Sequence, residues 1–343
     1  MNAHVGHPST AENDAVAASF LGKAPLLEVD DLRVHLPLRR RFPFSPKQSI
    51  KAVDGISLSI APGEIVGLIG ESGSGKTTFG RALLRLVAPS SGRIRFNGTD
   101  LTTLSSAEMR SFRRHMQMVF QDPYSSLNPR MSVGEAVGEP LSIHQPHLPT
   151  RARTERVAEL LSQVGIAPAH ASRHPHAFSG GQRQRIAIAR ALATEPDFIV
   201  ADEPVSALDV SVQAQIVNLL LDLKDRLGLT VLFISHDLSV ISHIADRVVV
   251  MYLGKVMEIA PPAAFQSASA HPYTRALVSA LPVEHPRLRR ARVPLKGEIP
   301  SAVHPPSGCV FRTRCPKASG NCAQVVPELR QVGAAHWAAC IKL

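Results

Sequence analysis

Three short runs of apolar residues predict strands that are buried on both faces of a parallel sheet. They span 65–69, 198–201 and 231–234. A continuous apolar run of this length is typical of a strand that helices cover on both sides. Each run leads directly into a polar segment. We therefore expect the polar segments to lie along the carboxyl edge of one sheet.

Two segments show helical periodicity. Leu83, Leu84 and Leu86 form the apolar side of a predicted helix that follows the first strand. The segment 153–164 is amphipathic, and its apolar face consists of Val157, Leu160, Leu161 and Val164. This second helix lies in the stretch of about 122–182, which we expect to form an inserted, mostly helical lobe.

The segment between the first strand and its helix reads Gly-Glu-Ser-Gly-Ser-Gly-Lys-Thr. A strand, a glycine-rich loop and a helix in that order predict a phosphate-binding loop. The glycines permit turns that point backbone N–H groups at phosphate oxygens, and the helix N-terminus adds partial positive charge. Lys76 is expected to reach the β- and γ-phosphates, and Thr77 to bind Mg²⁺. The expected ATP-binding residues of this segment are Gly70, Glu71, Ser72, Gly73, Ser74, Gly75, Lys76, Thr77 and Thr78.

The other two strands end in side chains that suit the hydrolysis of a nucleotide. The second strand delivers Asp202, which would hold Mg²⁺ through water, and Glu203, which would act as general base for the attacking water. The third strand delivers His236, which would contact the γ-phosphate and orient that water. The structural alternatives are an acid pair in the first turn of a helix and a histidine that caps a helix or is otherwise satisfied within the structure.

The order of these segments resembles the ATP-binding cassette (ABC) family over roughly residues 27–260. The matching motifs are Walker A at 70–77, the Q-loop residue Gln121, the signature at 179–182, Walker B ending at Asp202-Glu203, the D-loop at 206–209 and the switch residue His236. Phe178 replaces the usual leading leucine of the signature. The resemblance implies an α/β P-loop NTPase core with an antiparallel β subdomain, an inserted α-helical lobe and ATPase activity.

The resemblance also implies that one chain holds half of each ATP site. ATP lies between Walker A of one cassette and the signature of another. The residues expected to contact the partner's nucleotide are therefore Ser179, Gly181 and Gln182, and the D-loop residue Asp209 is a further expected ATP-binding residue. Gln121 is expected to touch Mg²⁺ and the attacking water while it couples closure to a neighbouring subunit. Binding of two ATP molecules closes the dimer, and hydrolysis reopens it.

Three further stretches resemble the dipeptide, oligopeptide and nickel importer subfamily. They are an extended Q-loop at 120–131, the segment 52–57 and the segment 271–275. This resemblance implies two membrane permease subunits that dock on the helical lobe, and an extracytoplasmic solute-binding protein. The segments 38–44 and 81–86 most resemble one of the two paralogous ATPases of such importers, so we expect a heterodimer with a second, paralogous ATPase. The imported solute would be a peptide or, alternatively, nickel or another small solute. A nucleic-acid-handling ATPase is the alternative from another class.

Hydropathy and charge favour a subunit that lies at a membrane without spanning it. No apolar run approaches the roughly 20 residues that a transmembrane helix needs, and the N-terminus has no signal-peptide core. We expect a peripheral position on the cytoplasmic face of the inner membrane. The net charge is +10, but the arginine-rich stretches 39–41 and 287–292 contain no interleaved aromatic residues. Base stacking is therefore poorly supported, and we expect no nucleic-acid partner.

Clustered cysteines near the end of the chain form the last candidate site. They are Cys309, Cys315, Cys322 and Cys340. In a cytoplasmic protein such a cluster indicates a metal site before it indicates disulfides. Zinc usually prefers cysteines about two to four residues apart, so the wider spacing here and Pro316 favour a [4Fe-4S] cluster, with zinc as the alternative. The segments 297–301, 306–309 and 314–316 resemble the C-terminal domain of peptide importer ATPases, which implies such a cluster in some members.

The predicted organisation has three parts. Residues 1–25 form a polar, mobile N-terminal arm, residues 26–265 form the ATPase domain, and residues 266–343 form a small C-terminal extension that carries the cysteines. Phe42 and Phe44, upstream of the phosphate loop, are alternative candidates for stacking on adenine, with simple packing as the other interpretation.

Overall fold

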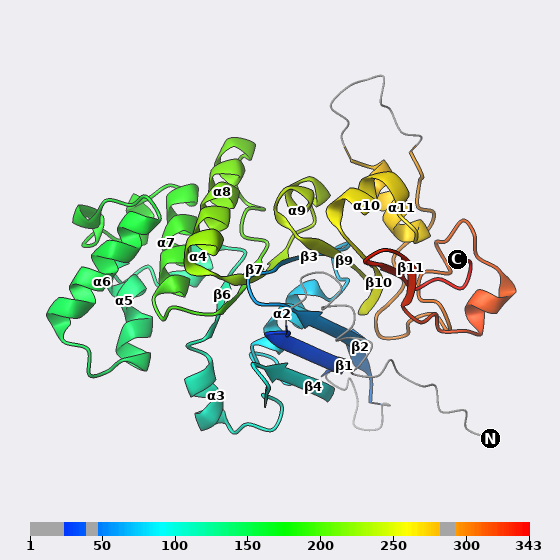
Figure 1. Cartoon of the computed structure of the whole chain (residues 1–343), viewed down its shortest axis with the longest axis horizontal. Coiled ribbons are helices and arrows are strands. Elements are labelled where there is room, and N and C mark those ends of the chain that lie inside the picture. The colour runs from blue at the N-terminus through cyan, green and yellow to red at the C-terminus, as the bar shows by residue number, and fades with distance from the viewer. Residues whose placement is uncertain (1–23, 39–46, 282–291) are drawn as a thin grey trace. The chain divides into compact units, whose positions relative to one another are not determined.

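A computed structural model describes residues 24–38, 47–281 and 292–343 of the chain (Figure 1). These residues form two compact units. The first unit comprises the described parts of Met1–Ala61, Ile65–Thr102 and His236–Leu343, and the second comprises Pro62–Glu64 and Thr103–Ser235. Some predictions fall on residues outside the described ranges, namely most of the N-terminal arm, Phe42, Phe44 and the stretches 39–41 and 287–291.

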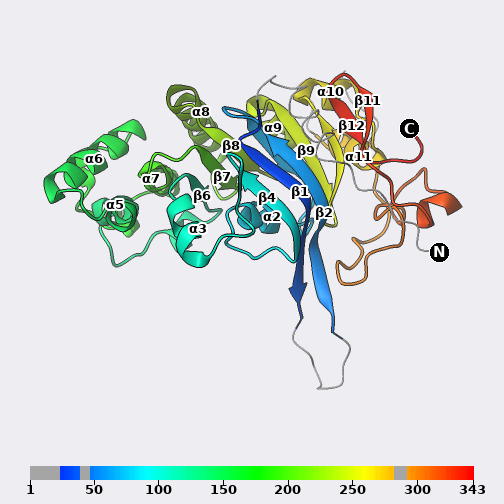
Figure 2. The ribbon, with the colours of Figure 1, turned by 60° about the horizontal axis from the view of Figure 1, so that its bottom comes forward.

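Within the described residues, the first unit contains an antiparallel sheet with the strand order β2, β1, β4, β5. The bounds are β1 (Leu27–Pro37), β2 (Ser49–Ile60), β4 (Ser91–Phe96) and β5 (Thr99–Asp100). β1 and β2 pair from Leu27 opposite Ile60 to Pro37 opposite Ser49, and Figure 2 shows them as two long strands side by side. Buried and partly exposed residues largely alternate along β1. Such alternation is typical of a sheet with one covered face.

The phosphate loop follows a strand of another sheet in the first unit. This strand is β3 (Ile65–Ile69), which runs parallel to β9 (Arg247–Tyr252), and all residues of both strands are buried. β9 turns back into β10 (Lys255–Ala260), which pairs with β12 (His336–Ala338). β12 in turn pairs with β11 (Arg330–Gly333). The end of the chain therefore joins the sheet from which the phosphate loop emerges.

Helices of the first unit pack around these strands. They are α2 (Lys76–Leu83), α9 (Leu238–Ile244), α10 (Pro262–Ala268) and α11 (Pro272–Ser279), with a 3-10 turn at Gly320–Ala323. α9 lies so close to β3 that a Cβ atom at Gly67 would collide with Ile241. This close approach accounts for a glycine in the middle of an otherwise apolar strand.

The second unit is built on a parallel sheet. Its strands are β6 (Met116–Val119), β7 (Phe198–Asp202) and β8 (Thr230–Ile234). β7 pairs with both neighbours, with Phe198 opposite Met116 on one side and opposite Thr230 on the other. All residues of β7 and β8 are buried. Their carboxyl ends therefore point to the same edge of the sheet, as parallel pairing requires.

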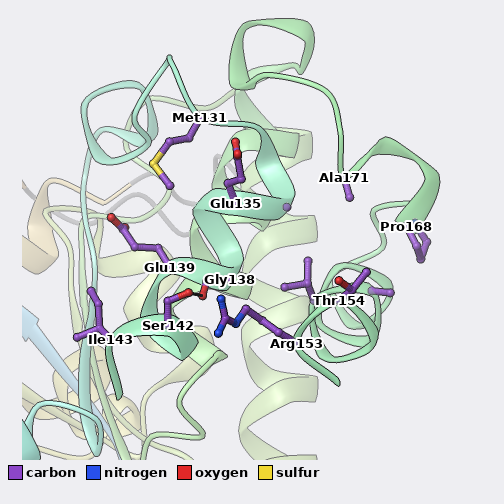
Figure 3. A pocket seen from close by; sticks show the side chains of 13 residues that line it. Met131, Glu135, Gly138, Glu139, Ser142, Ile143, Arg153, Thr154, Pro168 and Ala171 are labelled. Atoms are coloured by element: carbon purple, nitrogen blue, oxygen red, sulfur yellow. Dashed lines mark hydrogen bonds between the residues drawn. The ribbon is translucent and has the colours of Figure 1, made fainter. Parts of the chain in front are cut away.

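Helices fill most of the remaining second unit. They are α3 (Ser106–Phe112), α4 (Pro123–Ser126), α5 (Val133–His144), α6 (Thr150–Gln163), α7 (Gly180–Leu192) and α8 (Val210–Leu227), with 3-10 turns at Pro168–His170 and Pro175–Ala177. α5, α6 and α7 contact one another, and α7 also contacts α8. A cavity of about 580 Å³ lies beside α5 and α6. Figure 3 shows Ser142 of α5 and Arg153 and Thr154 of α6 around it.

The structure confirms the predicted strands and the amphipathic helix. β3, β7 and β8 match the three apolar runs to within one residue. α6 buries Val157, Leu160 and Leu161, and Val164, which is also buried, follows as its C-cap residue. The prediction for Leu86 was wrong, because α2 ends at Leu83 and Leu86 is 47% exposed. Arg85 adopts a left-handed φ of 52°, which ends the helical path before Leu86.

In the ranges that the structure describes, no helix combines the length and apolar character needed to cross a membrane.

Candidate nucleotide site

The phosphate loop leaves β3 at Ile69 and enters α2 at Lys76. Gly73 and Gly75 have φ values of 77° and 101°, which most residues with a side chain avoid. A Cβ atom at Gly75 would also collide with the backbone oxygen of Ala52. The sequence predicts glycine-dependent turns in this loop, and the structure contains them.

Lys76 turns its ammonium group into the loop. Nζ donates hydrogen bonds to the backbone oxygens of Gly70 at 2.7 Å and Glu71 at 3.1 Å, and to Ser74 Oγ at 3.4 Å. Only 6% of Lys76 is exposed. The loop thus holds a cation among its own backbone groups, an arrangement that suits an anionic ligand.

In the second unit, β7 ends in the two predicted acids. Asp202 is only 2% exposed, and Glu203 follows it with a left-handed φ of 46°. Such a backbone conformation is strained at a residue other than glycine, and strain of this kind clusters at functional sites. The amide nitrogen of Glu203 donates to the backbone oxygen of Ile234 at 3.0 Å, which fixes the turn. Gln121 Nε2 donates to Glu203 Oε2 at 2.9 Å, so the predicted general base and Q-loop residue lie together.

The signature residues form the start of α7. Ser179 and Gln182 make a capping box, in which Ser179 Oγ accepts from the amide of Gln182 at 3.3 Å and Gln182 Oε1 accepts from the amide of Ser179 at 3.0 Å. A Cβ atom at Gly181 would collide with Val212 of α8, so the close contact of α7 with α8 depends on this glycine. Phe178 is buried beside the ring of His170, at 6.2 Å between centroids.

The D-loop and switch residues lie at two further helix starts. Asp209 caps α8, accepting from the Val212 amide at 3.0 Å and from Ser211 Oγ at 2.8 Å. These hydrogen bonds, above all the one from the Val212 amide, lower the pKa of Asp209. His236 is exposed after β8, and it is Asp237 that caps α9. The predicted alternative of a capping histidine is therefore wrong, because a neighbouring carboxylate occupies the cap.

The four cysteines are free thiols in the C-terminal segment of the first unit. The amide of Cys309 donates to the backbone oxygen of Cys322 at 2.8 Å. Burial raises the pKa of the Cys309 and Cys315 thiols, whereas the Ser319 amide lowers the pKa of Cys322. In the described part of the chain, no three histidine, cysteine, aspartate or glutamate side chains gather into a metal-binding group. The sulfur donors thus suit a metal, but their arrangement is not a ligand set.

Two contacts of the phosphate loop are not predicted by the sequence. Tyr273 and Arg314 both bind Glu71, although they lie 202 and 243 positions further along the chain. Tyr273 belongs to the segment 271–275, whose resemblance to a subfamily gives no indication of a contact with the loop. Arg314 has no local pattern that points to the loop, so only the tertiary structure reveals it.

Comparisons with known proteins agree with the motifs. Residues 53–206 match the family described as ABC transporter, and residues 257–322 match the oligopeptide/dipeptide transporter C-terminal region. A putative peptide import ATP-binding protein of Brucella ovis is 56% identical, over 93% of this chain and 98% of that protein. The oligopeptide transport ATP-binding protein OppF of Haemophilus influenzae is 48% identical, over 94% of this chain and 98% of that protein.

Solved structures support the same assignment. A dimeric ATP-binding cassette in a post-hydrolysis state, bound to ADP and Pi, is 29% identical with a TM-score of 0.61, covering 69% of this chain and 98% of that chain. A cassette of the cbiONQ transporter complex of Clostridium perfringens is 30% identical with a TM-score of 0.60, covering 69% of this chain and 89% of that chain. The chain therefore belongs to the ATP-binding cassette family of transporter ATPases, and it carries the C-terminal region typical of oligopeptide and dipeptide transporters.

Proposed function

We propose that this chain hydrolyses ATP to power the import of peptides through a membrane transporter. The observation that carries the proposal is the phosphate loop, which holds the buried ammonium of Lys76 beside the backbone oxygens of Gly70 and Glu71. The names of the relatives in Brucella and Haemophilus, which refer to peptide and oligopeptide transport, support the choice of solute.

The phosphate loop and three oxygen donors of the chain would together hold Mg-ATP. Residues 70–78 would surround the phosphates, and Lys76 would exchange its loop oxygens for those of the β- and γ-phosphates. The hydroxyl of Thr77, the carboxylate of Asp202 and the amide oxygen of Gln121 are hard donors, which suit Mg²⁺. When bound, Mg²⁺ supplies positive charge that offsets the charge of the phosphates.

Glu203 would act as the general base for hydrolysis. Its carboxylate would take a proton from water as the water oxygen attacks the γ-phosphorus, and the bond to the bridging oxygen of ADP would break. The hydrogen bond from Gln121 supports this role because it orients the carboxylate. His236 would contact the γ-phosphate and help to place the water.

The base assignment is tested with Glu203→Gln in the assembled transporter. Loss of the carboxylate should lower turnover by at least about 100-fold, as expected for removal of a general base, while ATP still binds. Glu195→Gln is a matched control, because Glu195 also has a left-handed φ, 53°, but pairs with Arg156. Steady-state ATPase activity that is unchanged in Glu203→Gln would remove Glu203 from this role.

We propose that two cassettes close around ATP, with the second cassette supplied by a paralogous ATPase. Ser179, Gly181, Gln182 and Asp209 of this chain would then contact the nucleotide on the partner. The exposed start of α7 supports this proposal. The hydroxyl of Ser179 and the side-chain amide of Gln182 lie at a helix N-terminus, where the partial positive charge favours phosphate. One of the similar solved cassettes is dimeric and bound to ADP and Pi, which supports the pairing of two cassettes.

Two membrane permeases and an extracytoplasmic solute-binding protein would complete the importer. We assign the permease contact to the cavity beside α5 and α6, because its walls include the exposed Ile143 and the buried Val157. This assignment gives the chain a peripheral place on the cytoplasmic face of the inner membrane. It also gives a function to the predicted helical lobe at about 122–182, within the proposed ATPase domain at 26–265.

The solute is tested with the reconstituted transporter and its binding protein. A peptide should stimulate ATP hydrolysis, whereas Ni²⁺ should not, and added DNA or RNA should have no effect. Stimulation by Ni²⁺ alone would identify a nickel importer within the same family. Stimulation by nucleic acid without any membrane subunit would instead favour a nucleic-acid-handling ATPase.

We propose that the C-terminal extension at 266–343 binds a [4Fe-4S] cluster, with zinc as the alternative. The proposal is supported by the presence of four free thiols in one short segment; the sulfurs would have to move together to bind the metal. Chemical analysis of protein purified without air tests it. About four irons with acid-labile sulfide per chain would support the cluster, one zinc would support the alternative, and no metal would reject both.

A further inference from the structure

The C-terminal segment reaches back to the phosphate loop through one arginine. Arg314 Nη1 lies 2.5 Å from Glu71 Oε2, and Nη2 lies 3.2 Å from Glu71 Oε1. The two hydrogen bonds form a fork that fixes both the direction and the distance of the carboxylate. The side chain of Arg314 is 8% exposed and that of Glu71 is 25% exposed. A pair shielded to this degree is screened less by salt than a surface ion pair.

The same glutamate is also held through its backbone. The amide nitrogen of Glu71 donates to Tyr273 Oη at 2.9 Å, and Tyr273 is fully buried in α11. Phe311, three residues before Arg314, packs against Tyr252 and Tyr273, with ring centroids 5.3 Å apart in each case. The Arg314 guanidinium lies 5.9 Å from the centroid of the Tyr252 ring. An aromatic cluster thus joins the arginine, the tyrosine and the loop into one packed structure.

The position of Glu71 matters for a phosphate ligand for two reasons. Its backbone oxygen accepts a hydrogen bond from Lys76 Nζ at 3.1 Å, so a shift of Glu71 also shifts the surroundings of the lysine. Its carboxylate is an anion on a loop that would bind the anionic phosphates, and a nearby cation offsets the resulting repulsion. Arg314 serves both needs, because its two hydrogen bonds fix the position of Glu71 and its charge neutralises the carboxylate.

We propose that Arg314 is a positioning residue that holds the phosphate loop in its ATP-binding form through Glu71, and so couples the C-terminal segment to nucleotide affinity. The proposal rests on the assignment of residues 70–78 as the ATP-binding loop. It adds a regulatory connection, since any partner or chemical change that displaces the segment around Arg314 weakens ATP binding. By thermodynamic reciprocity, ATP binding also stabilises that segment.

The first test measures the dissociation constant of Mg-ATP for the full-length chain. Arg314→Gln should weaken binding about tenfold, within the usual range for coupling between two sites, and Arg314→Lys should recover part of the loss. Arg312→Gln is the matched control, because Arg312 lies in the same turn but binds Ser307. Equal affinities in Arg314→Gln and the parent chain would overturn the proposal.

A double-mutant cycle separates positioning from general damage to the segment. The effect of Arg314→Gln on affinity should largely disappear when Glu71→Gln is already present, because the pair is then already broken. An undiminished effect in that background would show that Arg314 does not act through Glu71.

Hydrogen exchange tests the coupling from the other direction. ATP should slow exchange in 309–315 in the parent chain but not in Arg314→Gln, whereas identical protection in both would contradict the coupling.

A separate variant distinguishes failure of this inference from failure of the ATP site itself. Lys76→Ala should abolish most Mg-ATP binding whether or not Arg314 has its proposed role. If Lys76→Ala weakens binding and Arg314→Gln does not, only the positioning role is rejected. If neither variant changes the affinity, the assignment of the loop as the ATP site is rejected as well.

Discussion

At the scale of single residues, one buried carboxylate connects the C-terminal strands to α11, the helix whose tyrosine binds the phosphate loop. Glu258 on β10 is fully buried and accepts hydrogen bonds from the amides of Ala270 at 2.7 Å and His271 at 2.8 Å. His336 Nε2 on β12 lies 2.7 Å from its Oε1. Because the carboxylate has several partners, its burial is compensated. Tyr273, which binds Glu71, lies just beyond this network.

His271 should make folding of the chain sensitive to pH. Burial lowers its pKa from 6.5 to about 4 in the folded state, and its Nδ1 accepts a hydrogen bond from the amide of Tyr273. Between these two values the unfolded chain binds a proton that the folded chain does not. Stability is therefore lost as the pH falls through this window, by about 2 kcal/mol at pH 5 relative to pH 7.5.

Urea unfolding at the two pH values measures this contribution. His271→Asn is the informative variant, because asparagine keeps an acceptor for the helix start but does not titrate. The free energy of unfolding of His271→Asn should fall less on acidification than that of the parent chain, by about 2 kcal/mol. The same acid sensitivity in both proteins would assign the effect to other groups.

At the scale of elements, three helices of the second unit begin with the same local device. α3, α5 and α7 each start with a capping box, formed by Ser105 with Glu108, Ser132 with Glu135, and Ser179 with Gln182. In each box the serine side chain accepts from the backbone three residues later, and the longer side chain accepts in return. The repeated motif allows structural and functional effects of a helix start to be compared within one protein.

Ser105→Ala, Ser132→Ala and Ser179→Ala should each lower the free energy of unfolding by about 1 kcal/mol, because each removes the side-chain acceptor of a cap. In the assembled transporter, Ser179→Ala should also slow ATP hydrolysis, since Ser179 is proposed to contact the nucleotide of the partner. Unfolding curves and steady-state ATPase rates measure the two effects. Equal ATPase rates in all three variants would reduce Ser179 to a structural cap.

Sequence patterns predict well those elements whose conformation is determined by residues close together in the sequence. The apolar runs at β3, β7 and β8 are visible because strands buried on both faces need apolar residues throughout. The phosphate loop is visible because its glycines are needed for its turns. The bond between Arg314 and Glu71 could not be predicted in this way, since it joins residues 243 positions apart. Likewise, the positive φ of Glu203 depends on its bond to Ile234 of β8 and has no sequence signature.

At the scale of the whole molecule, the chain has one phosphate loop and one signature, which the proposed dimer would use in different ATP sites. The phosphate loop would serve one site and the signature would serve the other. The sequence of one chain therefore identifies one half of each ATP site, but it does not identify the second cassette. The choice between a paralogous partner and a second copy of this chain has a measurable consequence, because the two assemblies respond differently to the loss of one lysine.

Lys76→Ala removes the proposed phosphate-binding cation from every copy of this chain. If the transporter contains one copy and one paralogous ATPase, the phosphate loop of the paralogue remains intact, and about half of the bound ATP should remain. If it contains two copies, both loops are lost and almost no ATP should bind. The measurement is the amount of labelled ATP per purified transporter, with Lys296→Ala, at an exposed position, as the control. Loss of nearly all bound ATP in Lys76→Ala, with normal binding in the control, would contradict the proposed heterodimer.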